Sequence, residues 1–77
     1  MKLVTKARFI NSISGEFIVE VAMYKAEIGF EILTRSKSTI EGEIRISEFH
    51  AREFYNKQLN ENRKGLQAME VIYEIRS

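Results

Sequence analysis

Apolar and polar residues alternate along most of this chain, and a single stretch with a helical repeat interrupts the alternation. A period of two is typical of a strand with one buried face. The alternating segments are residues 2–10, 16–24, 28–34, 39–47 and 68–76, and the helical stretch follows Ser47. We therefore predict an α+β fold, an antiparallel sheet of four to five strands with one helix packed on one face, in the order β-β-β-β-α-β.

The first two segments flank NSISG, residues 11–15, whose composition is typical of a turn. A hairpin closed there with Phe9 opposite Phe17 keeps the apolar residues of both strands on one face. The same register sets Lys6 opposite Glu20. Because this one pairing satisfies both faces, the sequence predicts it as the register of the first hairpin.

The chain has to turn again within KAEIG, residues 25–29. A strand from Phe17 to Thr34 would be about 60 Å long, which exceeds the size of so small a domain. The apolar residues also change from odd positions to the even positions Ile28, Phe30 and Ile32 at this point. The two observations predict a break in the strand, followed by a third strand.

The fourth strand can pair with the third in two registers that keep their isoleucines on the same face. Ile32 opposite Gly42 sets two glutamates against each other, whereas Ile32 opposite Ile44 sets glutamate against arginine. Like charges directly opposed are unfavourable by up to about 1 kcal/mol. We predict the second register, with a tight loop around Lys37 and Ser38 and with Ile40 on the face of Ile32.

The helix carries start and stop signals. Ser47 is a good N-cap, since its hydroxyl can accept a hydrogen bond from a free amide of the first turn, and Gly65 can end the helix in the left-handed conformation. At about 100° per residue, one stripe faces the sheet. Its members are Ala51, Phe54, Tyr55, Gln58 and Leu59.

Phe49 does not belong to this stripe, because it lies roughly 140° from the centre of the stripe. One explanation is that its ring folds back over the sheet edge near Ile46, where first-turn geometry is loose. The other is an exposed aromatic anchor beside Arg52, since aromatic residues and arginine dominate hot spots at protein interfaces. We leave both explanations open.

The residues that carry chemistry are few. The chain has no Cys and no Asp, and His50 is its only histidine, so we expect neither a metal site nor another cofactor. The serines of the turns are expected to bond the backbone, the glutamates to be solvated, and no glycine-rich phosphate loop is present. We therefore predict that the protein is not an enzyme.

Length and charge restrict the partners further. The 77 residues form one domain, residues 1–77, and the net charge of +1 gives no bulk attraction to nucleic acid or anionic lipid. No apolar run approaches the roughly 20 residues of a membrane span, and MKLVTKARF lacks the apolar block of a signal peptide. We expect a cytoplasmic protein with no membrane partner.

The remaining candidates for function are surfaces, because one helix covers only one face of the sheet. The other face is expected to hold apolar side chains among charges, namely Lys2, Lys6, Arg8, Ile10, Ile18, Tyr24, Leu33 and Ile72. Such a face is either solvated or binds a partner.

Our first hypothesis is a non-enzymatic protein-binding module. Its contact patches are Phe49 with Arg52 on the helix, and Ile18, Tyr24 and Leu33 on the uncovered sheet face. Another protein is the expected partner, and a homodimer is the alternative. Phages and mobile elements make small inhibitors of host or defence complexes, anti-CRISPR proteins included, and the likeness to them is one of size and style alone.

The second hypothesis is a small protein that binds single-stranded nucleic acid. Lys2, Lys6 and Arg8 form a basic stripe on the first strand, beside Tyr24 as a platform on which a base can stack. Against this hypothesis, Glu20 is expected to neutralise Lys6.

Overall fold

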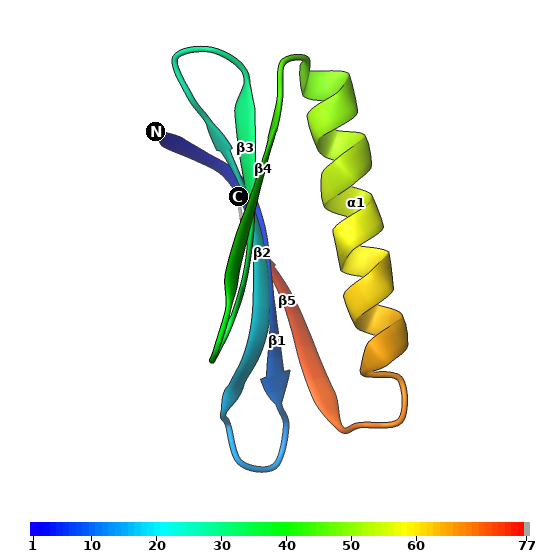
Figure 1. Cartoon of the computed structure of the whole chain (residues 1–77). Coiled ribbons are helices and arrows are strands. Elements are labelled where there is room, and N and C mark those ends of the chain that lie inside the picture. Colours follow the sequence, from blue (N-terminus) through cyan, green and yellow to red (C-terminus); the bar gives the residue numbers. More distant parts are fainter. Residues whose placement is uncertain (77) are drawn as a thin grey trace.

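The computed structural model describes residues 1–76 and consists of one antiparallel sheet with one helix laid along one face (Figure 1). The predicted α+β class and the element order β-β-β-β-α-β are confirmed. The elements are β1 (Lys2–Asn11), β2 (Phe17–Lys25), β3 (Phe30–Ser36), β4 (Ile40–Arg45), α1 (Glu48–Gly65) and β5 (Val71–Arg76).

The strands lie in the order β4-β3-β2-β1-β5. The first four strands form a meander, in which each strand pairs with the next one along the chain. The helix α1 then returns the chain across one face, so that β5 pairs antiparallel with β1 at the opposite edge (Figure 1). As a result β4 and β5 are the two edge strands of the sheet. We call the face away from α1 the open face.

The helix begins as the sequence predicts and ends differently. The Ser47 hydroxyl accepts a hydrogen bond from the His50 amide at 3.2 Å, which confirms the N-cap. Gly65 does not take the left-handed conformation, because among residues 1–76 only Gly15 and Gly29 have positive φ. The helix instead runs through Gly65, and the Leu66 amide closes the last turn by donating to backbone carbonyls of that turn.

The predicted helical stripe faces the core. Ala51, Tyr55 and Leu59 are buried, and α1 packs on β2, β3 and β4. The sheet contributes the other buried apolar side chains. These are Ala7, Phe9, Val19, Val21, Ala22, Met23, Phe30 and Ile32.

The break predicted at residues 25–29 is confirmed. β2 ends at Lys25 and β3 begins at Phe30, and Gly29 makes the turn with φ +77°. Phe30 and Ile32 are buried, as the change of parity predicts, whereas Ile28 lies in the loop and is 77% exposed. The predicted third strand therefore begins two residues too early, at Ile28 instead of Phe30.

The predicted register of the β1–β2 hairpin is wrong by two residues. Phe9 lies opposite Val19, and Glu20 lies opposite Arg8 rather than Lys6. The turn sets this pairing: the Asn11 amide donates to the Glu16 carbonyl at 2.8 Å, which brings Ile10 opposite Phe17. A β-bulge then leaves Ile18 without a partner, so Phe17 lies on the face opposite to the predicted one.

The predicted register of β3 and β4 is wrong by one residue, so every side chain of β4 lies on the other face. Ile32 lies opposite Glu43, while Ile44 lies opposite Glu31 and Ile40 opposite Arg35. The loop is the cause: Ser36 and Thr39 close a two-residue turn with a 2.8 Å backbone hydrogen bond, and this turn length excludes both registers considered above.

Candidate functional site

The open face carries an exposed apolar edge that results from the register of β4. The side chains of Ile40 and Ile44 point away from α1 and are 69% and 61% exposed. Leu33, opposite Gly42, lies on the same face of the neighbouring strand. We call Ile40, Ile44 and Leu33 the isoleucine edge. Ile72 on β5 adds a further side chain at the far edge and is 46% exposed.

The centre of the open face is a charge cluster around Glu20, which is only 9% exposed. Its carboxylate lies 3.9 Å from Lys6 Nζ, 3.5 Å from Arg8 Nε and 3.4 Å from Arg35 Nη2. The guanidinium groups of Arg8 and Arg35 also lie over the Phe17 ring, at 5.6 and 4.8 Å from its centroid. Each cation of the cluster therefore has a contact within the protein.

Two of the three sheet residues predicted for partner binding lie on the open face, namely Tyr24 and Leu33. Ile18 does not, because the β-bulge turns it towards α1, where it is half-buried against the core. The expected position of Ile18 on the open face is therefore wrong. The same bulge brings Phe17 to the open face in its place.

The predicted basic stripe is interrupted. Lys6 and Arg8 point to the open face, whereas a second bulge between Leu3 and Thr5 places Lys2 opposite Lys25, at a position that faces away from them. Lys2 is exposed, and nothing in the pairing brings it near the Glu20 cluster. The two remaining cations share Glu20, so the first strand offers no continuous line of free positive charge.

Phe49 is 71% exposed, and Ile46 is 72% exposed. The explanation in which Phe49 folds over the sheet edge against Ile46 is therefore wrong. Its ring meets His50 edge-on at 5.5 Å, and Arg52 pairs along the helix with Glu48 at 2.9 Å. Phe49 remains a candidate anchor, whereas the Arg52 predicted to act with it is already paired with Glu48.

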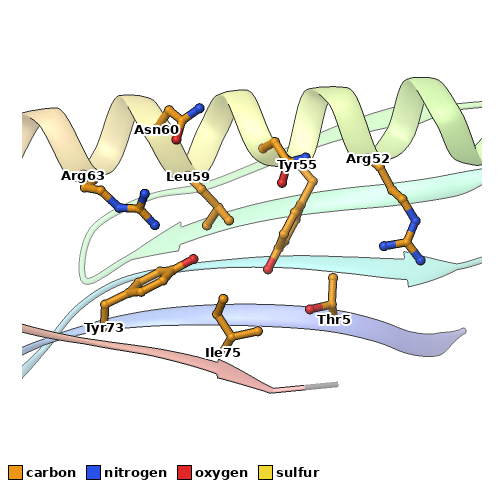
Figure 2. A pocket seen from close by; sticks show the side chains of 9 residues that line it. Thr5, Arg52, Tyr55, Leu59, Asn60, Arg63, Tyr73 and Ile75 are labelled. Carbon is orange, nitrogen blue, oxygen red and sulfur yellow. The ribbon is translucent and has the colours of Figure 1, made fainter.

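Sequence reasoning missed a groove on the helix side of the sheet. Because α1 packs on β2, β3 and β4, a cavity of about 440 Å³ lies between α1 and the strands β1 and β5. Figure 2 shows its lining side chains converging from three elements. Tyr55 and Leu59 come from α1, Thr5 from β1, and Tyr73 and Ile75 from β5. We call this cavity the α1–β5 groove.

The hydroxyl of Tyr55 lies at the floor of this groove. Tyr55 is 6% exposed, and its oxygen is buried without a hydrogen-bond partner among residues 1–76. Burial raises the pKa of the Tyr55 phenol, and the nearby Thr5 hydroxyl, which itself donates to the Arg76 carbonyl at 3.2 Å, lowers it in part. Buried hydroxyls nearly always have a partner, so this one needs an explanation.

Residues 1–76 contain no group of three or more metal-ligating side chains. The single histidine, His50, has its Nδ1 2.9 Å from the Ser47 hydroxyl at the N-cap. None of the described helices is long and apolar enough to cross a membrane.

Comparison of the chain with models of known families, with curated proteins and with solved structures gives no match.

Proposed function

We propose that this protein is a non-enzymatic protein-binding module that binds its partner through the open face. The observation that carries the proposal is the orientation of β4, which turns Ile40 and Ile44 to solvent at 69% and 61% exposure. Both faces of this strand are available to solvent, because none of its residues is buried. Exposed apolar side chains gathered at a sheet edge mark a contact surface rather than a solvated one.

The size of the contribution supports the proposal. Burying an isoleucine side chain contributes about 1.5–3 kcal/mol, so covering two that are each about two-thirds exposed contributes on the order of 3 kcal/mol. Leu33 extends the apolar surface towards the centre of the face, and the Glu20 cluster borders it. An apolar patch beside partly desolvated arginines has the composition of a protein interface core with its rim.

Nucleic-acid binding is the second candidate, supported by the Phe17 ring between Arg8 and Arg35. This candidate is weaker for two reasons. The Phe17 ring contacts two guanidinium groups already, and Glu20 lies within 4 Å of three of the nearby cations. A single-strand binder needs free aromatic faces and unneutralised charge.

We extend the proposal to biological context by analogy. A domain of this size with no chemical site resembles, in size and style only, the small inhibitors that phages and mobile elements direct at host or defence complexes. On this extension the protein acts in the cytoplasm by occluding a surface of another protein. The analogy rests on no motif.

The test is capture of a partner by matched variants. Ile44→Lys removes apolar surface from the open face, and Ile13→Lys makes the same substitution at a loop residue that is 80% exposed. Immobilised wild type and Ile13→Lys are expected to retain the same stoichiometric protein from a lysate of the source cells, and Ile44→Lys is expected to lose it. Equal retention by all three, or retention of nucleic acid alone, would contradict the proposal.

Self-association is separated from partner binding by sedimentation over a wide concentration range. The proposal expects a monomer at the concentrations used for capture. A dimer that survives dilution and is broken by Ile44→Lys would assign the isoleucine edge to a second copy of the chain instead.

A further inference from the structure

We propose that the α1–β5 groove is a second binding site, which receives an acidic, amphipathic helix of a partner protein. This inference belongs to the proposed class of function, but it uses other residues on the opposite side of the sheet. It rests on the dimensions of the groove, on the exposed side chain of Ile75 in it and on the charges of its lining.

The dimensions fit one helix. α1 covers β2, β3 and β4 and leaves the two strands β1 and β5 beside it. Two strand spacings amount to about 10 Å, which is also the distance between the axes of two packed helices. The groove follows α1 from Arg52 to Arg63, three turns or about 16 Å. A guest helix of about three turns therefore matches the length of the groove and places one of its faces in it.

The groove has apolar side chains among the polar groups of Thr5, Asn56 and Asn60. Ile75 is 60% exposed there, although it lies opposite the fully buried Ala7 on the side of the sheet that holds the core. Leu59 and Tyr73 continue the apolar lining along the groove. A guest helix needs one apolar stripe to cover them, which makes it amphipathic.

The rim determines the charge of the guest. Among residues 1–76, the groove is lined by two arginines, Arg52 and Arg63, and by no carboxylate. Arg52 pairs with Glu48, whereas Arg63 lies over the Tyr73 ring at 4.7 Å and has no carboxylate within 4.0 Å among residues 1–76. A guest with glutamate beside its apolar stripe supplies the missing carboxylate, which is the complementarity that selects partners at interfaces.

The experiment uses two synthetic helical peptides as probes. Both carry leucine at i, i+3, i+4 and i+7, and they differ only in having glutamate or lysine on either side of the leucine stripe. Binding is followed by the Ile δ1-methyl NMR signals of the full chain, because Ile75 reports on the groove and Ile40 and Ile44 report on the open face. Circular dichroism shows whether the peptide is helical when bound.

The glutamate peptide is expected to shift Ile75 saturably, and the lysine peptide to bind at least tenfold more weakly, a difference of about 1.4 kcal/mol. Arg63→Glu should weaken the glutamate peptide about tenfold. The matched control Lys64→Glu makes the same charge change in the same last turn but outside the groove, and should leave binding unchanged.

Several results would overturn the inference. These are equal binding of the two peptides, shifts confined to Ile40 and Ile44, a bound peptide that is extended rather than helical, or no saturable shift up to about 1 mM, the weak end of specific binding. Ile44→Lys should leave peptide binding intact. The proposed binding by the groove and the proposed binding by the open face are therefore tested by different variants.

Discussion

Replacement of Tyr55 by phenylalanine is expected to stabilise the free protein. The substitution removes one oxygen, which is buried and has no hydrogen-bond partner, and leaves the ring in the core stripe of α1. Burying a hydroxyl without a partner costs about 1–3 kcal/mol in proteins. Since the ring and its packing remain, Tyr55→Phe should raise the free energy of unfolding by about 1 kcal/mol, at the low end of that range.

The assay is reversible urea unfolding of the two proteins, together with thermal melting. For a domain of this length, about 1 kcal/mol corresponds to a rise of roughly 4–8 °C in the melting temperature. The control is Tyr73→Phe, which removes a hydroxyl from the same groove at a residue that is only half-buried. Its unfolding free energy should stay within about 0.5 kcal/mol of wild type.

The pH dependence of the same pair gives a second readout. Burial raises the pKa of Tyr55 above its ordinary value of 10.0, so above that pH the unfolded chain loses this proton more readily than the folded protein. This part of the stability is present below pH 10 and is lost as the pH rises towards the folded pKa. The advantage of Tyr55→Phe over wild type should therefore grow above pH 10.

If Tyr55→Phe instead lowers the free energy of unfolding by 1 kcal/mol or more, about the value of a typical hydrogen bond, this reasoning is refuted. Such a loss would mean that the hydroxyl is bonded in the free protein.

Three further predictions concern residues outside the groove. Gly29→Ala should destabilise the protein by about 2 kcal/mol or more in urea unfolding, because φ is +77° and a Cβ would lie 2.6 Å from the backbone carbonyl of Arg45, the last residue of β4; Gly65→Ala, with open space around it, should be neutral or stabilising. Glu20→Gln should cost about 2 kcal/mol at low salt and less at 1 M salt, since it leaves three cations without their shared carboxylate; an effect independent of salt would contradict that assignment. The hydrogen bond and charge of Lys37 lower the pKa of the Glu16 carboxyl below 4.5, so an NMR titration should find it depressed, and Lys37→Ala should return it towards 4.5; an unchanged value in the variant would contradict this pairing.

The fold could be predicted from the sequence because its signals are local. Alternation over residues 2–10 and 16–24 defines strands, Ser47 defines the helix start, and the change of apolar parity near Gly29 marks the break between β2 and β3. Each of these features depends on a few neighbouring residues. Their sum determines the element order, and the helical stripe determines which face of α1 is buried.

The registers could not be predicted with the same rules, because they depend on turns and bulges. In the first hairpin, the Asn11 turn and an unpaired Ile18 change the pairing by two residues while most core residues stay on the expected face. In the hairpin of β3 and β4, charge pairing and the alternation of isoleucines both favoured a register that a two-residue turn forbids. A slip by one residue exchanges the two faces of a strand. The predicted register therefore placed Ile40 and Ile44 on the core face instead of the open face.

The prediction of the sites followed from these registers. Tyr24 and Leu33 were placed on the open face correctly because their segments of β2 and β3 contain no bulge. Ile40 and Ile44 were missed because apolar alternation was equated with the core. The α1–β5 groove was missed because its existence depends on which strands α1 covers, a tertiary property that the helical stripe does not contain.

The measurement that tests the central claim most directly is the Ile δ1-methyl spectrum of the protein bound to its captured partner. The isoleucines report on separate surfaces: Ile40 and Ile44 on the open face, Ile75 in the groove, and Ile13 and Ile28 in loops. The account predicts that Ile40 and Ile44 shift on binding while Ile13 and Ile28 do not. Unchanged signals from Ile40 and Ile44 in the complex would contradict the claim that β4 turns these side chains outward to bind a partner.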